Sequence, residues 1–321
     1  MALLLVSASV LLLGAYLHAA DDERDETRPD RTVETLAAVT LSVEYDLEGV
    51  DPVDERDGNY TRTDYGSATG LLADAAVTNL HIDGEQILPY ANDFEDAVDA
   101  STASALLGAN REFYVVAEWE PYEGAAINGT ATAGERPPPN EDISSRTLSA
   151  SSDRPAVEEA DLSTESDESD DVLETAGEAI GAAIIEGYFP PESTQRTLES
   201  QGLSRELTVY HYERLVAPLE YEFDEETNSD DESPLNRSEA DALEANDHVL
   251  YGSDSQSESD SGASGLADWI ASDLETAFAD ELEAIDETHG DDSERDEAIT
   301  VLLADEVSTD DVTITVQTWQ P

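Results

Sequence analysis

The sequence predicts an α+β protein: an N-terminal transmembrane helix followed by an extracellular body, in which helices pack a small, mainly antiparallel sheet and acidic disordered loops interrupt both. Three observations predict it. Residues 2–20 are apolar and uncharged, short segments near both ends of the remaining chain alternate apolar and polar residues, and longer segments between them repeat every three or four residues. Strands at both ends with helices between them favour an α+β fold whose first and last strands share one sheet.

The run ALLLVSASVLLLGAYLHAA at 2–20 is interpreted as a membrane anchor. Its nineteen residues would rise about 28 Å as a helix, close to the hydrocarbon thickness of a bilayer. A cleaved signal peptide is one alternative, but no Lys or Arg precedes the run. Cleavage after Ala20 would also place His18 three residues before the cut, where a small residue is required. A buried helix is the other, yet the run has no polar face. A chain that opens on MALLLV also suggests a missing basic segment upstream.

Residues 21–38 are expected to form an acidic juxtamembrane segment, with the body outside the cell. Arg24, Arg28 and Arg31 follow the apolar run, and the positive-inside rule taken alone would put the body inside. Long domains, however, cross membranes largely regardless of such charges. We therefore predict a single-pass protein of the cell membrane that contacts the lipid bilayer through residues 2–20 and has an extracellular body.

The body, residues 39–321, shows periodic segments from end to end. In chain order the predicted elements are a strand at 39–45, helices at 67–79 and 93–107, a strand at 111–121, helices at 172–189, 192–200, 204–216 and 266–288, and a strand at 312–319. The segment 266–288 is the best marked, because its apolar residues recur at helical spacing opposite acids. The pair Pro190 and Pro191 ends the helix predicted at 172–189.

Three stretches rich in acids and serine interrupt this body. They are 151–171, 224–234 and 252–264. Segments of low hydrophobicity and high like charge cannot offset the entropy lost on ordering. We expect all three to be disordered linkers.

The charge balance identifies the solvent to which the chain is adapted. It has 77 acidic residues against 14 basic ones, all of them Arg, and a formal net charge of −63. Such self-repulsion is screened near 1 M salt, where the Debye length is about 3 Å. Acids spread along the whole chain fit adaptation to high salt better than an acidic tail for a basic partner. Nucleic acid is excluded as a partner because no basic cluster is present to neutralise phosphates.

The sequence predicts no catalytic residue, no cofactor-binding residue and no metal ligand. There is no cysteine, and the five histidines are not spaced to hold a metal: His18, His81, His211, His248 and His289. Phosphate-loop, nucleophile-elbow and HExxH motifs are absent as well. The segment RELTVYHYERL is interpreted as a helix with an aromatic core edge. We therefore expect a protein that is not an enzyme, uses no cofactor and has no evident small-molecule substrate.

Two further features point to surface and core positions. Sequons at Asn59, Asn128 and Asn236 agree with an exterior body. Trp119 and Trp319 each close a strand-like run, so both are expected to pack at the end of a sheet.

Several motifs together resemble a family of uncharacterised haloarchaeal proteins. These motifs are LLLVSASV at 3–10, WEPYEG at 119–124, PPP at 137–139, GYFPP at 187–191 with Thr194 after it, and TITVQTW at 313–319. The family resembles single-span envelope proteins whose genes lie near type IV pilus-like or secretion machinery. This resemblance implies no catalytic activity, and the absence of a basic segment before the apolar run departs from it.

The leading hypothesis is a non-catalytic, membrane-anchored surface protein that is a structural or assembly accessory of a pilus-like or secretion apparatus in a halophilic archaeon. Its partners would be envelope, pilus or secretion proteins. One alternative is a pilin-like subunit with a truncated N-terminus. Another is an anchored surface hydrolase or solute-binding protein, which needs a deep pocket with converging polar groups.

Overall fold

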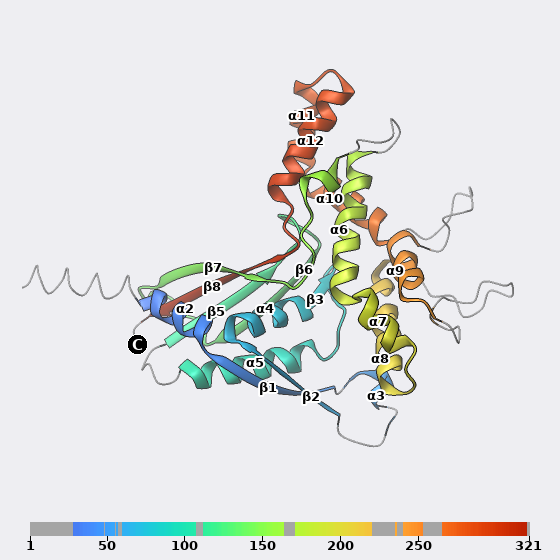
Figure 1. Cartoon of the computed structure of the whole chain (residues 1–321). Coiled ribbons are helices and arrows are strands. Elements are labelled where there is room, and N and C mark those ends of the chain that lie inside the picture. The colour runs from blue at the N-terminus through green and yellow to red at the C-terminus, as the bar shows by residue number, and fades with distance from the viewer. Residues whose placement is uncertain are drawn as a thin grey trace, which may run out of the picture.

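The computed structural model describes residues 28–47, 49–54, 56, 60–106, 112–163, 171–219, 235, 240–252 and 265–319. An antiparallel sheet carries helices on one face, and a two-stranded sheet lies beyond one of these helices (Figure 1). A separate group of helices packs beside them. The fold is thus α+β, as predicted.

The main sheet has six strands in the order β4-β3-β6-β5-β8-β7, and every neighbouring pair is antiparallel. The strands are β3 (Leu80–Ile82), β4 (Glu85–Gln86), β5 (Glu112–Trp119), β6 (Ile127–Gly134), β7 (Ser144–Ser151) and β8 (Asp311–Trp319). Alternation puts Val115, Ala117, Ile314 and Val316 on the helix-covered face, where all four are fully buried. The C-terminal strand β8 pairs with β5 on one side and β7 on the other, so it lies inside the sheet and not at its edge.

Three helices cover this inner face: α2 (Arg28–Ala38), α4 (Ala68–Thr78) and α5 (Ala91–Leu106). The hydroxyl of Ser67 caps α4 by accepting from the backbone N–H of Gly70 at 3.0 Å. Helix α4 lies very close to β6, since a Cβ at Gly129 would come within 2.1 Å of the carbonyl oxygen of Ala76. Only glycine allows this approach.

The remaining helices form what we call the helical lobe. It comprises α3 (Asp51–Asp54), η2 (Glu159–Leu162), α6 (Val172–Tyr188), α7 (Pro191–Leu198), α8 (Leu203–Val216), η3 (Ala217–Leu219), α9 (Ala242–Tyr251) and α10 (Leu266–Ala277). Helix α6 is its centre and packs closely on α10, because a Cβ at Gly177 would lie 2.4 Å from the carbonyl oxygen of Ala267. The hydroxyl of Tyr122, after β5, donates to Asp273 of α10 at 2.6 Å and joins the lobe to the sheet.

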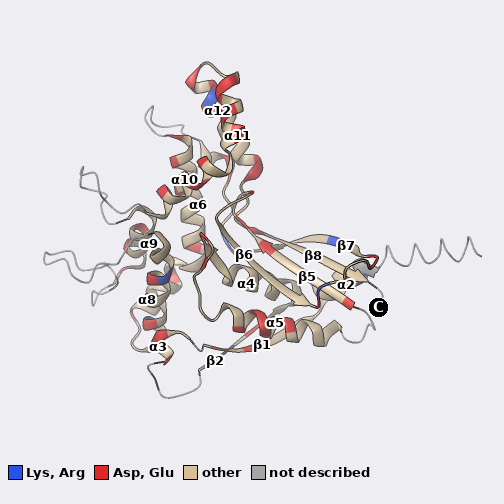
Figure 2. Ribbon diagram, turned by 180° about the vertical axis from the view of Figure 1, so that it is seen from behind, with Lys and Arg blue, Asp and Glu red and all other residues tan. Residues whose placement is uncertain are grey.

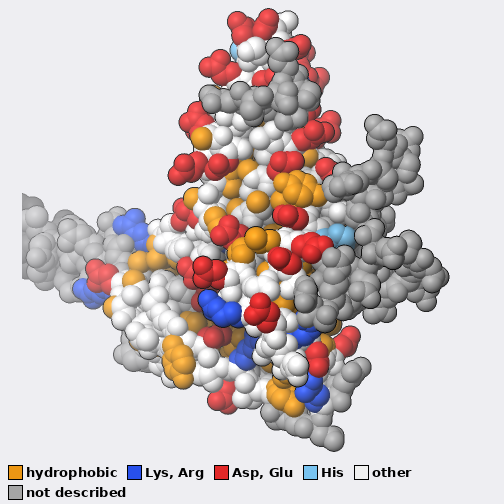
Figure 3. Space-filling view, turned by 45° about the vertical axis from the view of Figure 1, so that its right-hand side comes forward, with side chains coloured by type: hydrophobic (Ala, Val, Ile, Leu, Met, Phe, Trp, Pro, Cys, Tyr) orange, Lys and Arg blue, Asp and Glu red, His pale blue; other side chains and the backbone are white. Residues whose placement is uncertain are grey.

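Helices α11 (Ala279–Thr288) and α12 (Asp292–Glu306) form an arm that protrudes from the body (Figure 1). None of the α11 residues is buried, and the arm is rich in acids (Figure 2). Acidic side chains cover it in the space-filling view, whereas the Arg side chains seen there lie on the body below (Figure 3). Most of the acidic side chains of the arm are exposed to solvent.

The predicted fold class needs a correction at the N-terminus. No helix within the described ranges has both the length and the apolar character needed to cross a membrane. The run at 2–20 lies outside those ranges, and the described residues form an α+β fold. Of the predicted juxtamembrane segment, residues 28–38 form α2, whose Leu36 is fully buried against the sheet.

Two further predictions about the elements are wrong. The first strand, β1 (Thr40–Asp46), does not share a sheet with β8. It pairs with β2 (Thr61–Ser67) in a two-stranded sheet, because a partner close in sequence is available. The helix predicted at 266–288 is two helices that meet at Phe278, whose side chain is buried and packs near the Tyr122 ring.

The predicted linkers fall mostly outside the described residues, including all of 224–234 and 253–264. Residues 151–163 of the first one are described. They contain the end of β7, a turn at 152–154 in which Ser152 and Arg154 are buried, and the helix η2, which contacts both α6 and α12. This part of the segment belongs to the packed body.

Candidate functional site: a pocket between the sheet layer and the helical lobe

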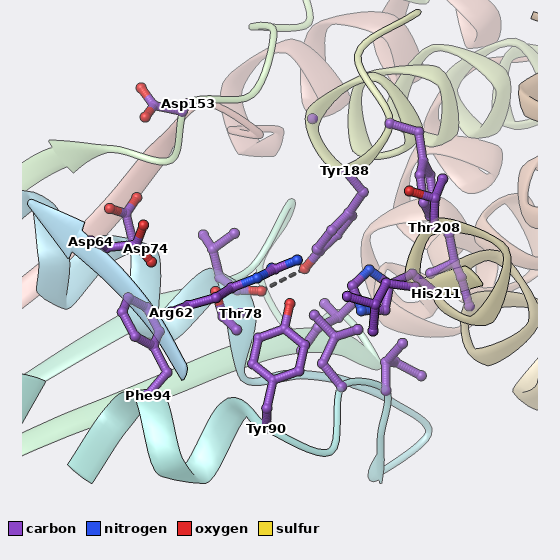
Figure 4. Close-up of a pocket in the computed structure, with 18 of the residues that line it drawn as sticks. Arg62, Asp64, Asp74, Thr78, Tyr90, Phe94, Asp153, Tyr188, Thr208 and His211 are labelled. Atoms are coloured by element: carbon purple, nitrogen blue, oxygen red, sulfur yellow. Dashed lines mark hydrogen bonds between the residues drawn. The ribbon is translucent and has the colours of Figure 1, made fainter. Parts of the chain in front are cut away.

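A cavity of about 590 Å³ lies where the helical lobe meets the β1–β2 sheet and the helices α4 and α5. We call it the interlayer pocket. Its charged side chains are Arg62, Asp64, Asp74, Asp153 and Arg154. Figure 4 shows Asp64 and Asp74 grouped on one side, His211 and Thr208 of α8 on the other, and Arg62, Tyr90 and Tyr188 converging between them. The pocket therefore brings together residues far apart in the sequence.

The β1–β2 pair supplies one wall of the pocket through its register. Tyr45 stands directly opposite Arg62, so their side chains leave the same face of the two-stranded sheet. The hydroxyl of the buried Tyr45 donates to Asp64 at 2.9 Å and fixes that carboxylate. Both Arg62 and Asp64 are exposed.

A tight turn after β7 supplies Arg154. The Ser152 hydroxyl donates to the carbonyl of Thr309 at 2.7 Å and accepts from the backbone N–H of Arg154 at 3.2 Å. Asp153 between them has a φ of 57°, a left-handed conformation that Asp tolerates better than most residues. This turn directs the Arg154 side chain inward.

Arg154 is 6% exposed and lies between aromatic side chains. Its guanidinium carbon is 4.4 Å from the centroid of the Trp119 ring and 4.3 Å from that of Tyr188. Nη1 donates to the carbonyl of Ser152 at 3.3 Å, but Nε and Nη2 have no hydrogen-bond partner among the described residues. Burial lowers the pKa of this guanidinium, while Tyr188 and Asp74 oppose that effect. A buried cation with two unpaired donors is costly, so something is expected to satisfy them.

Asp74, on α4, is the half-buried carboxylate of the pocket. Burial raises its pKa to about 6, with further contributions from Asp153 and Asp64, while Arg154 acts in the opposite direction. No described residue donates a hydrogen bond to Asp74, and it forms no ion pair with Arg154. The charges of Arg154 and Asp74 therefore interact electrostatically although the two side chains form no ion pair.

The opposite wall contains Tyr90 and His211. Burial raises the pKa of Tyr90 to about 12. Burial, assisted by the positive charge of Arg62, lowers the pKa of His211 to about 4, so this imidazole is neutral at physiological pH. Its Nε2 is buried without a hydrogen-bond partner in the described part of the chain. The ring lies 5.7 Å from Tyr90 and 6.1 Å from Tyr210 (centroid to centroid), which agrees with the aromatic edge predicted for α8.

The other histidines are dispersed. His81 is in β3, His248 in α9 and His289 follows α11, while His18 lies outside the described residues. Within the described ranges no group of three or more His, Cys, Asp or Glu residues could hold a metal ion. Of the sequons, Asn128 is in β6 with its Nδ2 donating to the carbonyl of Ala125, and the other two are not described.

Sequence reasoning missed the pocket because its key residue lies in a segment that composition assigns to a linker. The only local signal is that Arg154 and the SSD before it follow a run of alternating polar residues.

A second hollow of about 600 Å³, on the outer face of the sheet, is lined by Glu118, Glu123, Glu306 and Asp311 among others. None of its lining side chains has a buried unpaired polar atom, so the interlayer pocket is the better candidate.

The fold and this pocket define a class of protein: a strongly acidic α+β protein with a polar, aromatic pocket between its sheet layer and a helical lobe. The chain belongs to the family of unknown function DUF7284, whose family model matches residues 1–319. No curated protein and no solved structure matches the chain.

Proposed function

We propose that this protein is a non-catalytic binding protein whose interlayer pocket takes a small polar solute. The observation that supports the proposal most directly is Arg154, which is buried in the pocket wall and whose Nε and Nη2 atoms have no hydrogen-bond partner among the described residues. The volume of about 590 Å³ lies in the usual range for small-ligand sites, about 300–1,000 Å³. Aromatic side chains with a few converging polar groups are the usual lining of such sites.

The polar groups of the pocket support binding better than catalysis. Asp64 is fixed by Tyr45, and the Ser152 hydroxyl is committed to a backbone carbonyl. His211 has aromatic neighbours, and no described residue accepts or donates at its Nε2. A nucleophile activated by an adjacent base, the usual sign of covalent catalysis, is not found among these described side chains.

A steric variant tests the proposal. Thr208 lines the pocket, and its hydroxyl donates to the carbonyl of Ser204 at 3.1 Å. Thr276, on the exposed face of α10, makes the same bond to Ser272 at 3.1 Å and is the matched control. Equilibrium dialysis of the full chain against amino acids, organic acids, polyamines and sugars in molar KCl should find a saturable ligand. Thr208→Tyr should abolish its binding and Thr276→Tyr should not.

Two results would overturn the proposal. One is that no solute class binds at millimolar concentration. The other is that a ligand binds equally well to the wild type and to Thr208→Tyr, which would place it outside the pocket.

We also propose that the protein works outside the cell as an accessory of a pilus-like or secretion apparatus in a halophilic archaeon. The supporting observations are the motif resemblance, the acidic composition and the helix α11, which protrudes and has no buried residue. Affinity purification of the full chain at molar salt should recover envelope, pilus or secretion proteins. Replacing the exposed acids Asp280, Glu281 and Glu287 of α11 with their amides should reduce that recovery, and unchanged recovery would exclude these side chains from the contact.

A further inference from the structure

The interlayer pocket carries both signs of charge, and this limits the kind of ligand that fits it. Two arginines, Arg62 and Arg154, face three carboxylates, Asp64, Asp74 and Asp153. A simple anion would satisfy the arginines and be repelled by the acids, and a simple cation would do the reverse. We propose that the ligand is a small zwitterion, with a carboxylate bound at Arg154 and an ammonium bound at Asp74. This inference rests on the proposed binding function.

The anionic end of the ligand follows from Arg154. With Nη1 bonded to the carbonyl of Ser152, the donors left are Nε and Nη2, neither of which has a partner among the described residues. A carboxylate accepts from an arginine through two parallel N–H···O bonds, which is the strongest geometry open to both groups. Trp119 and Tyr188 lie against the guanidinium and restrict its orientation.

The cationic end follows from Asp74 and the rings beside it. Asp74 receives no hydrogen bond from any described residue, and burial together with Asp153 and Asp64 makes its ionised form unfavourable. A bound ammonium would stabilise that ionised form. Aromatic faces also attract cations, and the rings of Tyr45, Tyr90 and Tyr188 all line the cavity.

Arg154 and Asp74 interact electrostatically but do not form an ion pair with each other. A molecule that carries a carboxylate and a cationic nitrogen can therefore contact both side chains. Both α-amino acids and betaines have this chemistry, and the difference between them is whether the nitrogen donates hydrogen bonds to Asp74.

Titration calorimetry of the full chain in molar KCl tests the inference. The probes are glycine, glutamate and glycine betaine as zwitterions, acetate as carboxylate alone, and methylammonium as ammonium alone. At least one zwitterion should bind, with acetate and methylammonium at least about tenfold weaker, because each forms only one of the two charged contacts. A preference for the amino acids would identify hydrogen bonding to Asp74, and a preference for the betaine would identify the aromatic rings, as the main ammonium contact.

Two variants with matched controls test which side chain binds the carboxylate of the ligand and which binds its ammonium. Arg154→Gln should weaken zwitterion binding about 10- to 100-fold, the loss expected for charge-assisted hydrogen bonds, and Asp74→Asn should do the same. Arg136→Gln changes an exposed arginine that lies over Tyr114, and Asp268→Asn changes an exposed acid of α10, so neither should affect binding. If Arg154→Gln does not fold, Arg154→Lys replaces it, because lysine keeps the positive charge but cannot form the two parallel hydrogen bonds of a guanidinium.

The outcomes separate the two proposals. The zwitterion proposal is wrong if acetate binds as tightly as every zwitterion, or if Asp74→Asn binds the zwitterion as the wild type does. Either result leaves the proposed solute-binding function standing. Binding of a sugar that Thr208→Tyr abolishes, with no zwitterion bound, has the same consequence. Absence of any bound solute overturns both proposals.

Discussion

The guanidinium of Arg154 lies 4.4 Å from the centroid of the Trp119 ring, although the two residues belong to different motifs. The Trp119 indole N–H donates at 3.0 Å to the carbonyl of Thr309, which also accepts from the Ser152 hydroxyl beside Arg154. On its other side the guanidinium meets Tyr188 of the GYFPP run. The segments WEPYEG and GYFPP, which identified the resemblance, therefore meet around one buried cation.

Gly187 is the first testable element of this arrangement. A Cβ at this position would lie 2.4 Å from Cγ of Arg154. Gly187→Ala should therefore displace the arginine stem and lower the free energy of unfolding by about 1–3 kcal/mol, as overpacking of a tight site does. Urea denaturation at molar KCl measures it. Gly290→Ala is the control, because a Cβ there meets nothing within 4 Å. Equal stability of the two variants would contradict the close contact.

Tyr212 tests the core of the helical lobe. Its ring stacks on Phe189 with centroids 3.6 Å apart, and its hydroxyl donates to the buried Asn246. Tyr212→Phe keeps the stacking and leaves the Asn246 oxygen without that donor, so the free energy of unfolding should fall by about 1–3 kcal/mol. Thermal unfolding followed by circular dichroism measures the change. Tyr65→Phe, at a side chain 75% exposed, should change nothing, and a similar loss in both variants would refute the buried bond.

Asp74 predicts a pH-dependent stability effect. Its folded-state pKa of about 6 is above the ordinary value of 3.8. The folded state therefore binds the proton more tightly than the unfolded state, and ionised Asp74 destabilises the fold as pH rises through about 6. Asp74→Asn should raise the urea midpoint at about pH 8 and give no such gain at about pH 4, where the acid is protonated in the fold. A gain independent of pH would show that charge is not the cause.

The acidic arm predicts a dependence on salt. Asp280, Glu281 and Glu287 of α11 are all exposed. At about 0.1 M salt the Debye length is about 10 Å, so their mutual repulsion acts across the arm, whereas at about 1 M it is about 3 Å and largely screens them. Replacing all three with their amides should raise the thermal midpoint in low salt and leave it nearly unchanged in molar KCl. An equal rise at both salt concentrations would indicate a change in helix propensity instead of charge.

Local patterns predicted most of the longer helices but only three of the eight strands in the described part of the chain, β1, β5 and β8. The alternation in 312–319 and in 111–121 predicted β8 and β5, and the helical spacing in 172–189 predicted α6, because burial of one face leaves a period in the sequence. The same patterns could not predict which strands pair. The two-stranded β1–β2 sheet and the break at Phe278 depend on what each segment packs against, and that information is not local.

The candidate site was the least predictable feature. Arg154 follows a Ser-rich, polar strand and precedes an acidic run, so composition alone places it in a linker. Hydrogen bonds from Ser152 to residues 309 and 310 build the turn that buries it, and these partners are more than 150 positions away.

The sequence by itself determined the acidic, lysine-free composition, the exclusion of cysteine chemistry and the α+β class, since charge, residue type and periodicity are properties of the chain. The tertiary structure decided that β8 lies inside the sheet, that residues 151–163 belong to the body, and that Arg154 and Asp74 share one pocket. The physical reason is that burial and unpaired hydrogen-bond donors arise only when distant segments pack. A side chain becomes part of a binding site through neighbours that its own segment does not contain.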